Sequence, residues 1–435
     1  MQYEECRNLP RLCLDFRSGT GKMALTMHDC KVLDAQWATT DLSHRFTPGE
    51  PGVLYMDANS IGPMPLDAPA RMQQILQQGW AMARRRSWSE LDWLDQPHSL
   101  AARVAHLIGA EPADVMITDN TSVNQYKLLR YALSVQKPRR VVVMERDVFP
   151  SNRYVAQGLQ SAGLVDLRLV DDMTQLDAAL APDDVAVVSL SHVDYRSSVR
   201  LDMATINARV HARGALSLWD LSHSAGAVAI DLRGSDSDLA VSCGYKYLCG
   251  GPGAPSLVYV HPRWADGAWP AVCGWMGHAD TFAFDQDYRP GAGPSRFLVG
   301  TPPVLANAAF STAAEIWREV DPQAMDARHR SLTDTLIHLL DTQCAGLGVM
   351  VESPRVHAQR GGHVAIRCVD APASAVAQAL VASKVIVSAR KPDSLRFGVH
   401  PLTTTHTQLW QVVQALAQVL QSASWRDPRF SGPTI

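Results

Sequence analysis

Two pairs of side chains that could perform chemistry follow short apolar runs in the middle of the chain. Asp220 and His223 follow LSLW, and Tyr245 and Lys246 follow LAVSCG. A carboxylate at the end of a buried strand needs a cationic partner, such as a structural arginine or the protonated ring nitrogen of a cofactor. A lysine amine in apolar surroundings is a candidate nucleophile, but it also fits a structural lysine whose amine reaches solvent. Each pair alone therefore fits either role.

Hydroxyl and aromatic side chains follow two further runs. Thr121 and Ser122 come after VMIT and open a helical pattern, where they could cap the helix or bind a phosphate at its positive end. Phe149 follows VVVMER beside a proline turn, where an aromatic side chain usually packs within the loop. A glycine-rich turn, CGGPG, follows Lys246, and it joins the hydroxyl, aspartate and lysine residues in one set. Together these residues match the requirements of pyridoxal phosphate (PLP). The lysine forms a Schiff base, Asp220 keeps the pyridine nitrogen protonated, and the hydroxyls hold the phosphate. The combination predicts a PLP enzyme of fold type I.

Short β-branched runs recur from Ala101 onward, with helical patterns between several of them. The runs are ADVMITDN, RRVVVMER, LVDLRLV, DVAVVSLSHV, LSLWDLSH, LAVSCGYKY and SLVYVH. Near-continuous apolar strands that alternate with helices predict an α/β fold, with a mostly parallel sheet covered on both faces. In such sheets, functional groups gather beyond the C-terminal ends of the strands. The residues named above stand at those ends: Thr121 and Ser122, Phe149, Asp220 and His223, and Tyr245 and Lys246.

The pattern divides the chain into three parts. We expect an N-terminal arm over 1–54, a large PLP-binding domain over 55–315 and a smaller α/β domain over 316–435. A segment rich in proline and glycine, 287–303, ends the region in which strand and helix patterns alternate. Residues 1–22 lack periodicity, so we expect them to be disordered or to precede a translation start at Met23 or Met27.

Composition excludes several classes of protein. The 435 residues carry a formal net charge of −3, which argues against a general nucleic-acid binder. No run approaches the roughly 20 apolar residues of a membrane helix, and the N-terminus lacks the apolar core of a signal peptide. The 8 cysteines form no C-x-x-C pair, so we expect no metal site and reduced thiols. A cytoplasmic enzyme with a small-molecule substrate fits best.

Nine segments of the chain resemble kynureninase, from about Tyr55 to the C-terminal helix. They are YMDANSIGPMP (55–65), RSWSELDW (86–93), DNTSVNQYKLL (119–129), FPSNRY (149–154), LWDLSHSAGA (218–227), YKYLCGGPG (245–253), GWMGHA (274–279), FLVGTPP (297–303) and LRFGVHPL (395–402). The resemblance implies a homodimer with PLP sites at the subunit interface. It also implies hydrolysis of the Cβ–Cγ bond of L-kynurenine, or of a ring-substituted kynurenine such as 3-hydroxykynurenine, to the anthranilate and L-alanine.

The resemblance also implies roles for individual residues. Lys246 would carry PLP and move the α-proton, Tyr245 would act in acid–base chemistry, and Asp220 would pair with the ring nitrogen. The other cofactor contacts would be Thr121, Ser122, Phe149, Asn152, His223, Tyr245 and Trp275, with Thr301 reaching the phosphate from the second subunit. Substrate contacts would be Arg396 at the α-carboxylate, Asn59, Ser60, and Trp88 with Gly300 at the aryl ring.

Four departures from the family pattern lie around the substrate end of the expected site or among the residues that support it. Asn152 replaces an aspartate, Cys249 an asparagine and Thr403 a tyrosine, and the family's GDFR becomes VSAR over 387–390. An amide at 152 adds no negative charge, so ring protonation would depend more on Asp220. The Trp88 and Gly300-Thr301 combination resembles enzymes that prefer kynurenine to 3-hydroxykynurenine.

Two other readings compete with this one. A cysteine desulfurase-like lyase of the same fold would need a catalytic thiol in a mobile loop, for which Cys344 and Cys368 are the candidates. A PLP-binding homologue without catalysis would explain Asn152 and the VSAR segment. The first would release sulfide from cysteine, whereas the second would bind PLP and turn over no amino acid.

Overall fold

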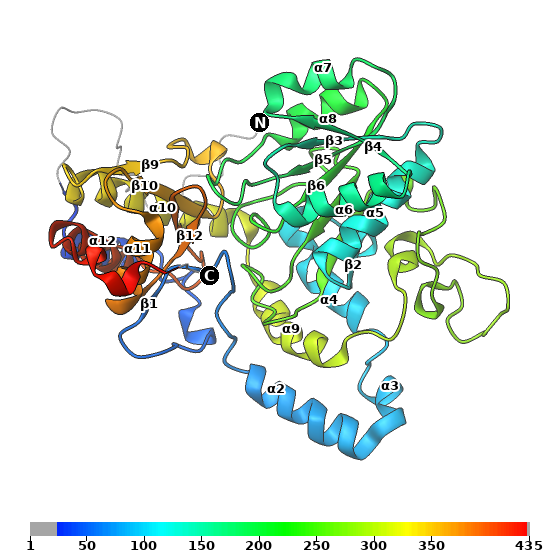
Figure 1. The fold of residues 1–435 in the computed structure, drawn as a ribbon. Helices are drawn as coiled ribbons and strands as arrows, with labels where there is room; N and C mark the ends of the chain where they lie inside the picture. Colours follow the sequence, from blue (N-terminus) through cyan, green and yellow to red (C-terminus); the bar gives the residue numbers. More distant parts are fainter. Residues whose placement is uncertain (1–23, 433–435) are drawn as a thin grey trace, which may run out of the picture.

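A seven-stranded sheet forms the centre of the computed structural model, which describes residues 24–432 (Figure 1). The expectation for residues 1–22 lies outside the described residues. The strand order is β2-β8-β7-β6-β5-β3-β4. Only β8 is antiparallel to its neighbours, which confirms the mostly parallel sheet. The strands are β2 (Val115–Thr118), β3 (Val141–Glu145), β4 (Asp166–Val170), β5 (Val185–Ser191), β6 (Leu216–Asp220), β7 (Leu239–Ser242) and β8 (Ser256–Val260).

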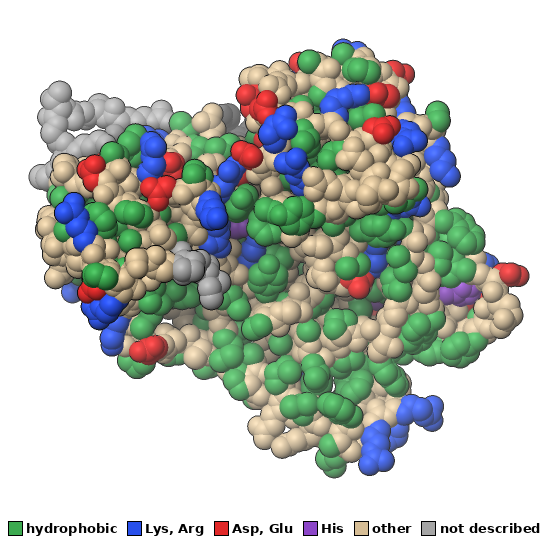
Figure 2. All heavy atoms as spheres, in the orientation of Figure 1, with side chains coloured by type: hydrophobic (Ala, Val, Ile, Leu, Met, Phe, Trp, Pro, Cys, Tyr) green, Lys and Arg blue, Asp and Glu red, His purple; other side chains and the backbone are tan. Residues whose placement is uncertain are grey.

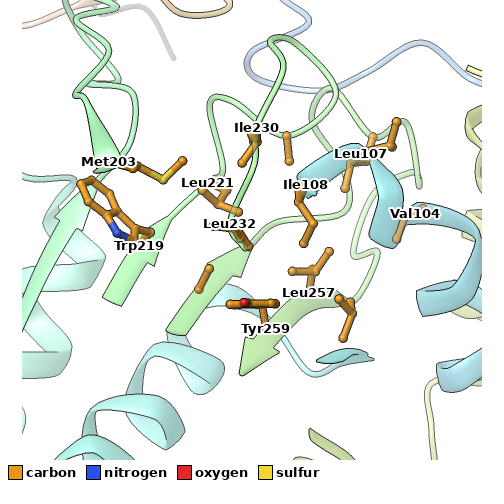
Figure 3. Packing of buried hydrophobic residues seen from close by; sticks show 14 of the residues in the cluster. Val104, Leu107, Ile108, Met203, Trp219, Leu221, Ile230, Leu232, Leu257 and Tyr259 are labelled. Atoms are coloured by element: carbon orange, nitrogen blue, oxygen red, sulfur yellow. The ribbon is translucent and has the colours of Figure 1, made fainter. Parts of the chain in front are cut away.

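Helices cover both faces of this sheet. Successive residues of a strand point to opposite faces, so they enter two separate apolar clusters. In β3, Val141 and Val143 belong to one cluster, whereas Val142 and Met144 belong to the other. Figure 3 shows part of the first cluster, in which Trp219 and Tyr259 pack among aliphatic side chains. The helices up to β8 are α1 (Met27–Gln36), α2 (Ala68–Gln74), α3 (Ser87–Glu90), α4 (Gln96–Val104), α5 (Thr121–Val135), α6 (Pro150–Ser161), α7 (Leu176–Leu180) and α8 (Met203–His211). No helix among residues 24–432 is long and apolar enough to cross a membrane.

A second, antiparallel sheet with the order β12-β13-β10-β9 follows in the C-terminal part of the chain. Its strands are β9 (Val349–Val351), β10 (His363–Cys368), β12 (Ser388–Arg390) and β13 (Ser394–Gly398). The helices of this part are α9 (Val304–Trp317), α10 (Pro322–Gln343), α11 (Ala373–Ala382) and α12 (His406–Gln421). The last three pack with this sheet around their own apolar cluster. The small α/β unit expected after the main sheet is therefore present.

The N-terminal segment is tied to this second unit at α1 and at β1, although Phe46 packs in the core of the main sheet. The Asp34 carboxylate at the end of α1 accepts hydrogen bonds from the backbone N–H groups of His406 (2.6 Å) and Thr407 (3.1 Å), which begin α12. Strand β1 (Leu54–Tyr55) pairs in parallel with β11 (Val385–Ile386). These long-range contacts bring the N-terminal segment beside the last strands of the chain.

A projecting segment, residues 64–91, extends from the body of the molecule through α2, a π-helix (Ile75–Ala83) and α3 (Figure 1). Its exposed large apolar side chains are Met64, Leu66, Leu76, Trp80 and Met82. Apolar side chains are visible along it in Figure 2. An exposed apolar surface of this kind marks an interaction site.

Glu145, half-buried at the end of β3, makes stability depend on pH. Burial, with the carboxylates of Asp194 and Asp172, raises its pKa from 4.5 to about 7. The unfolded chain therefore ionises this group at lower pH than the folded chain does, and the free energy of unfolding falls as the pH rises from about 4.5 to about 7. Glu145→Gln lacks this loss, so we expect its stability relative to the wild type to increase by about 1–2 kcal/mol between pH 5 and pH 8. Urea unfolding of both proteins at the two pH values measures this increase, and a stability difference that does not change with pH would contradict it.

Candidate active site

A cavity of about 230 Å³ lies where β2, β3, β5, β6 and β7 end. Because the carboxyl ends of parallel strands meet at one edge, residues far apart in sequence line it together. Its predicted cofactor-binding residues are Thr121, Ser122, Phe149, Asn152, Asp220, His223, Tyr245 and Lys246. The lining also includes Asn120, Ser151, Ser191, Val193, Tyr195, Ser222 and Cys243.

The N-terminus of α5 forms one wall of the cavity. Its cap is Asn120, whose side-chain oxygen accepts a hydrogen bond from the Val123 N–H at 3.1 Å. Thr121 and Ser122 are therefore the first helical residues rather than the cap. Their hydroxyls and the free N–H groups of this first turn are suited to hold a phosphate.

The Lys246 amine lies inside the cavity beside a neutral histidine. Its Nζ is 2.9 Å from Nε2 of His223 and 5.7 Å from the centre of the Phe149 ring. Burial and the neighbouring Lys246 hold the pKa of His223 well below its usual range. The other ring nitrogen of His223, Nδ1, is buried and has no hydrogen-bond partner among residues 24–432. The amine therefore has an uncharged neighbour.

Asp220 faces the same cavity with its negative charge uncompensated. Its oxygens accept hydrogen bonds from the Ser222 N–H (2.9 Å) and from Nδ2 of Asn152 (2.8 Å). Among residues 24–432 no cation forms an ion pair with this buried carboxylate. A buried carboxylate without a cation is costly, so the site fits a ligand with a protonated ring nitrogen, as PLP has. Asn152 thus orients the Asp220 carboxylate without adding charge.

Tyr245 keeps its proton at neutral pH. Burial, with the neighbouring Cys243 and Asp220, raises the pKa of the Tyr245 hydroxyl to about 12. The hydroxyl is therefore available as a hydrogen-bond donor.

Arg396 is buried on β13 and is absent from the cavity lining. Its Nη1 donates to the backbone carbonyl of Tyr195 at 2.5 Å. The Tyr195 ring meets the Phe149 ring edge-on, with centroids 5.2 Å apart. Burial lowers the pKa of Arg396 to about 10, which leaves the guanidinium charged at neutral pH. Tyr195, which sequence reasoning missed, thus connects Arg396 with the cavity wall. Its position just after a strand end was the available signal.

The motif that carries Asn59 and Ser60 packs against the turn around Lys246. The Gly62 N–H donates to the backbone carbonyl of Tyr245 at 2.9 Å. Asn59 is buried, and its side chain lies beside Gly398 at the end of β13. The N-terminal motif therefore lies between the lysine turn and the strand that carries Arg396.

Gly62→Ala is expected to disturb the lysine turn. A Cβ at Gly62 would lie 2.2 Å from the carbonyl oxygen of Lys246 and 2.7 Å from Sγ of Cys249, so backbone must move. We expect at least about a tenfold loss of turnover and about 1–3 kcal/mol of unfolding free energy. Gly158→Ala in α6, where a Cβ has open space, is the matched control and should leave both unchanged or slightly improve stability. Equal behaviour of the two variants would argue against this contact.

Besides Arg396, Asn59 and Ser60, four further predicted site residues do not line the cavity. Trp88 packs edge-on against Trp93, with ring centroids 5.5 Å apart. Trp275 is 38% exposed, and Gly300 and Thr301 are exposed as well. None of the four lines the cavity.

Comparisons with known proteins place relatives of one family beside this chain. Residues 325–416 match the family model of the kynureninase C-terminal domain. Kynureninase of Pseudomonas fluorescens is 39% identical, over 93% of this chain and 98% of the relative. Kynureninase of Deinococcus radiodurans is 41% identical, over 90% of this chain and 96% of the relative.

Solved structures of lower identity share the fold. A cysteine desulfurase from Thermococcus onnurineus NA1 has a TM-score of 0.71 at 16% identity, over 87% of this chain and 98% of its own. A C-DES mutant with glycine covalently linked to the PLP cofactor has a TM-score of 0.72 at 19% identity, over 86% and 98%. These neighbours confirm the fold-type-I architecture. The near-full-length relatives show that the chain belongs to the kynureninase family of PLP-dependent hydrolases that act on carbon–carbon bonds.

Proposed function

We propose that the protein hydrolyses L-kynurenine at the Cβ–Cγ bond and releases anthranilate and L-alanine. One observation carries the proposal. A single cavity holds the Lys246 amine beside neutral His223 and the uncompensated Asp220 carboxylate, with the buried cation Arg396 behind its wall. These groups provide an attachment point, a partner for a ring N–H and a partner for an α-carboxylate.

PLP, when bound, supplies the electron sink that stabilises negative charge at the substrate α-carbon. Thr121, Ser122 and the first N–H groups of α5 would hold its phosphate, and Phe149 would cover its ring. Asp220, oriented by Asn152 and Ser222, would hold the proton on the ring nitrogen. Lys246 would bind the cofactor and move the α-proton.

Cleavage also requires water to add to the γ-carbonyl of the substrate. The oxygen that gains charge in this step needs a preorganised donor. Tyr245, protonated up to a pH of about 12, would serve as that donor and as the acid–base group of the step. Arg396 would fix the other end of the substrate through its α-carboxylate, with Asn59 and Ser60 beside it.

The aryl pocket would favour kynurenine over 3-hydroxykynurenine. Trp88 contributes a ring packed on Trp93, and Gly300 with Thr301 adds little bulk. An apolar pocket rejects an added hydroxyl only weakly, by about a hundredfold at most. We therefore expect turnover of both substrates, with kynurenine faster.

The working form would be a homodimer in the cytoplasm. The projecting segment exposes a set of large apolar side chains, and Trp88, Trp275 and Thr301 lie away from the cavity of their own chain. A second copy of the chain would cover the projecting segment. Trp88, Trp275 and Thr301 of one copy would then complete the site of the other. The described free cysteines suit a reducing compartment. Light scattering on the holoenzyme tests the dimer, and a monomer with full activity would contradict it.

The alternatives have weaker support. Burial raises the pKa of the Cys344 and Cys368 thiols to about 12, which leaves little thiolate for a desulfurase reaction. The non-catalytic reading depends on Asn152, but Asn152 donates a hydrogen bond to Asp220 and thus supports the site.

Anthranilate fluorescence tests the proposal. PLP-loaded protein is given L-kynurenine, with 3-hydroxykynurenine and L-cysteine in parallel. We expect anthranilate release that is faster than release of the hydroxylated product, and no sulfide. Bound PLP without product from any substrate would instead support the non-catalytic reading.

A further inference from the structure

The partners of Arg396 are all neutral. Oγ of Ser388 accepts from Nε at 3.2 Å and from Nη2 at 2.9 Å, and the Tyr195 carbonyl accepts from Nη1. With the Asn59 amide turned so that its nitrogen donates to Asp57, its oxygen lies 3.3 Å from both Nε and Nη2. Among residues 24–432, no carboxylate forms an ion pair with this guanidinium.

The charges around the guanidinium act in opposite directions, because Asp57 favours the charged form of Arg396 and Arg390 disfavours it. Asp57 is the nearby carboxyl, but the Asn59 amide stands between it and Arg396. Burial raises the pKa of Asp57, whereas hydrogen bonds from Ser388 and Ser60, followed by the charges of Arg396 and Arg390, act in the opposite direction. Arg390, two residues after Ser388, adds a second positive charge that disfavours the charged form of Arg396. The local excess of charge is therefore positive.

Strand register makes position 388 the place where this charge would be balanced. Ser388 lies directly opposite Arg396 in the antiparallel pair of β12 and β13. Side chains directly opposite one another project from the same face of a sheet and meet. A carboxylate at position 388 would take the two hydrogen bonds of Oγ and neutralise the cation.

We propose that Ser388 is a positioning residue that holds Arg396 without neutralising it. The α-carboxylate of the substrate or product then supplies the missing negative charge. Amino acids with a carboxylate consequently bind more tightly than they would with an acidic residue at 388. The inference depends on the proposed role of Arg396 as the carboxylate partner.

L-Alanine is the probe, because it carries the α-carboxylate and binds without turnover of kynurenine. Its dissociation constant is measured on holoenzyme from the change in cofactor absorbance. Ser388→Asp and Ser388→Asn are equal in size and differ in charge. We expect L-alanine to bind the Asp variant at least about tenfold more weakly than the Asn variant, while kcat for kynurenine differs by less than about threefold.

A second ligand distinguishes the effect of a negative charge at position 388 from general damage to the binding site. The amine 3-amino-1-(2-aminophenyl)propan-1-one keeps the aryl ketone and lacks the carboxylate. It should bind the Asp and Asn variants equally. Ser388→Thr, which keeps the hydroxyl and suits a strand, should stay within about threefold of the wild type for L-alanine.

The outcomes are distinct. Equal L-alanine affinities of the Asp and Asn variants would overturn the role of Ser388, as would a loss shared by the carboxylate-free amine. If the Asp variant does not fold, weaker L-alanine binding by Ser388→Ala than by Ser388→Thr supports the inference, and equal binding overturns it. If kynurenine is not cleaved but the charge effect is present, the proposed substrate fails and the role of Ser388 stands.

Discussion

Lys246→Ala is expected to abolish kynurenine hydrolysis, with a loss of at least about ten-thousandfold in kcat. The substitution removes both the attachment point of PLP and the group that moves the α-proton, and each contributes orders of magnitude. The variant should also lose the absorbance band of the lysine–cofactor linkage. Because Nζ contacts His223 and no carboxylate in the described chain, its removal leaves no buried counter-charge behind. The fold should therefore survive.

Steady-state kinetics, the absorbance spectrum and a thermal melt together check this result. Lys31→Ala, on the exposed face of α1, is the matched control and should retain the spectrum and full turnover. A small free amine such as methylamine should restore part of the proton transfer, but not the covalent linkage to the protein. Wild-type turnover in Lys246→Ala would remove the basis of the proposed mechanism.

Asp220→Asn is expected to reduce kcat by about a hundred- to a thousandfold. The amide keeps the shape of the side chain and can still accept the Ser222 N–H, but it no longer stabilises a proton on the cofactor ring. The electron sink is weakened, whereas the phosphate site at the start of α5 is untouched. PLP content should therefore fall much less than kcat. Both are measured on the same PLP-saturated preparation.

Asn152→Ala is the informative companion to Asp220→Asn. It removes the donor to one oxygen of the Asp220 carboxylate but keeps the negative charge. We expect about a tenfold loss of kcat, together with about 1–3 kcal/mol of lost stability from the unsatisfied buried oxygen.

If kcat of Asp220→Asn stays within about threefold of the wild-type value, the carboxylate does not control the protonation of the ring nitrogen.

Periodicity and strand ends already located much of the cavity. The β-branched runs matched the strands of the main sheet, and Asp220, Tyr245, Lys246 and Thr121 each follow one of them. A general rule of parallel sheets then places these residues at one edge, without knowledge of any particular contact. For this reason the chemistry of the cofactor pocket could be predicted from residue types and order.

The cap of α5 and the partner of Asn152 could not be predicted in this way. Asn120, Thr121 and Ser122 are all acceptable caps, and only the backbone at the helix start selects Asn120. Asn152 lies far from Asp220 in sequence, and its hydrogen bond joins the first turn of α6 to the last residue of β6. The local sequence pattern indicates which residues are buried and which form helices or strands, but it does not indicate which polar groups contact one another.

Composition, the succession of strands and helices along the chain and the residues at strand ends were determined by the sequence itself, because burial and periodicity are local properties of the chain. The meeting of Ser388 with Arg396, of Gly62 with the Lys246 turn, and of Tyr195 with Phe149 was decided only by tertiary structure. Each of these contacts depends on a strand register or on the packing of distant segments, and a shift of one residue would turn the same side chains to the other face of their sheet.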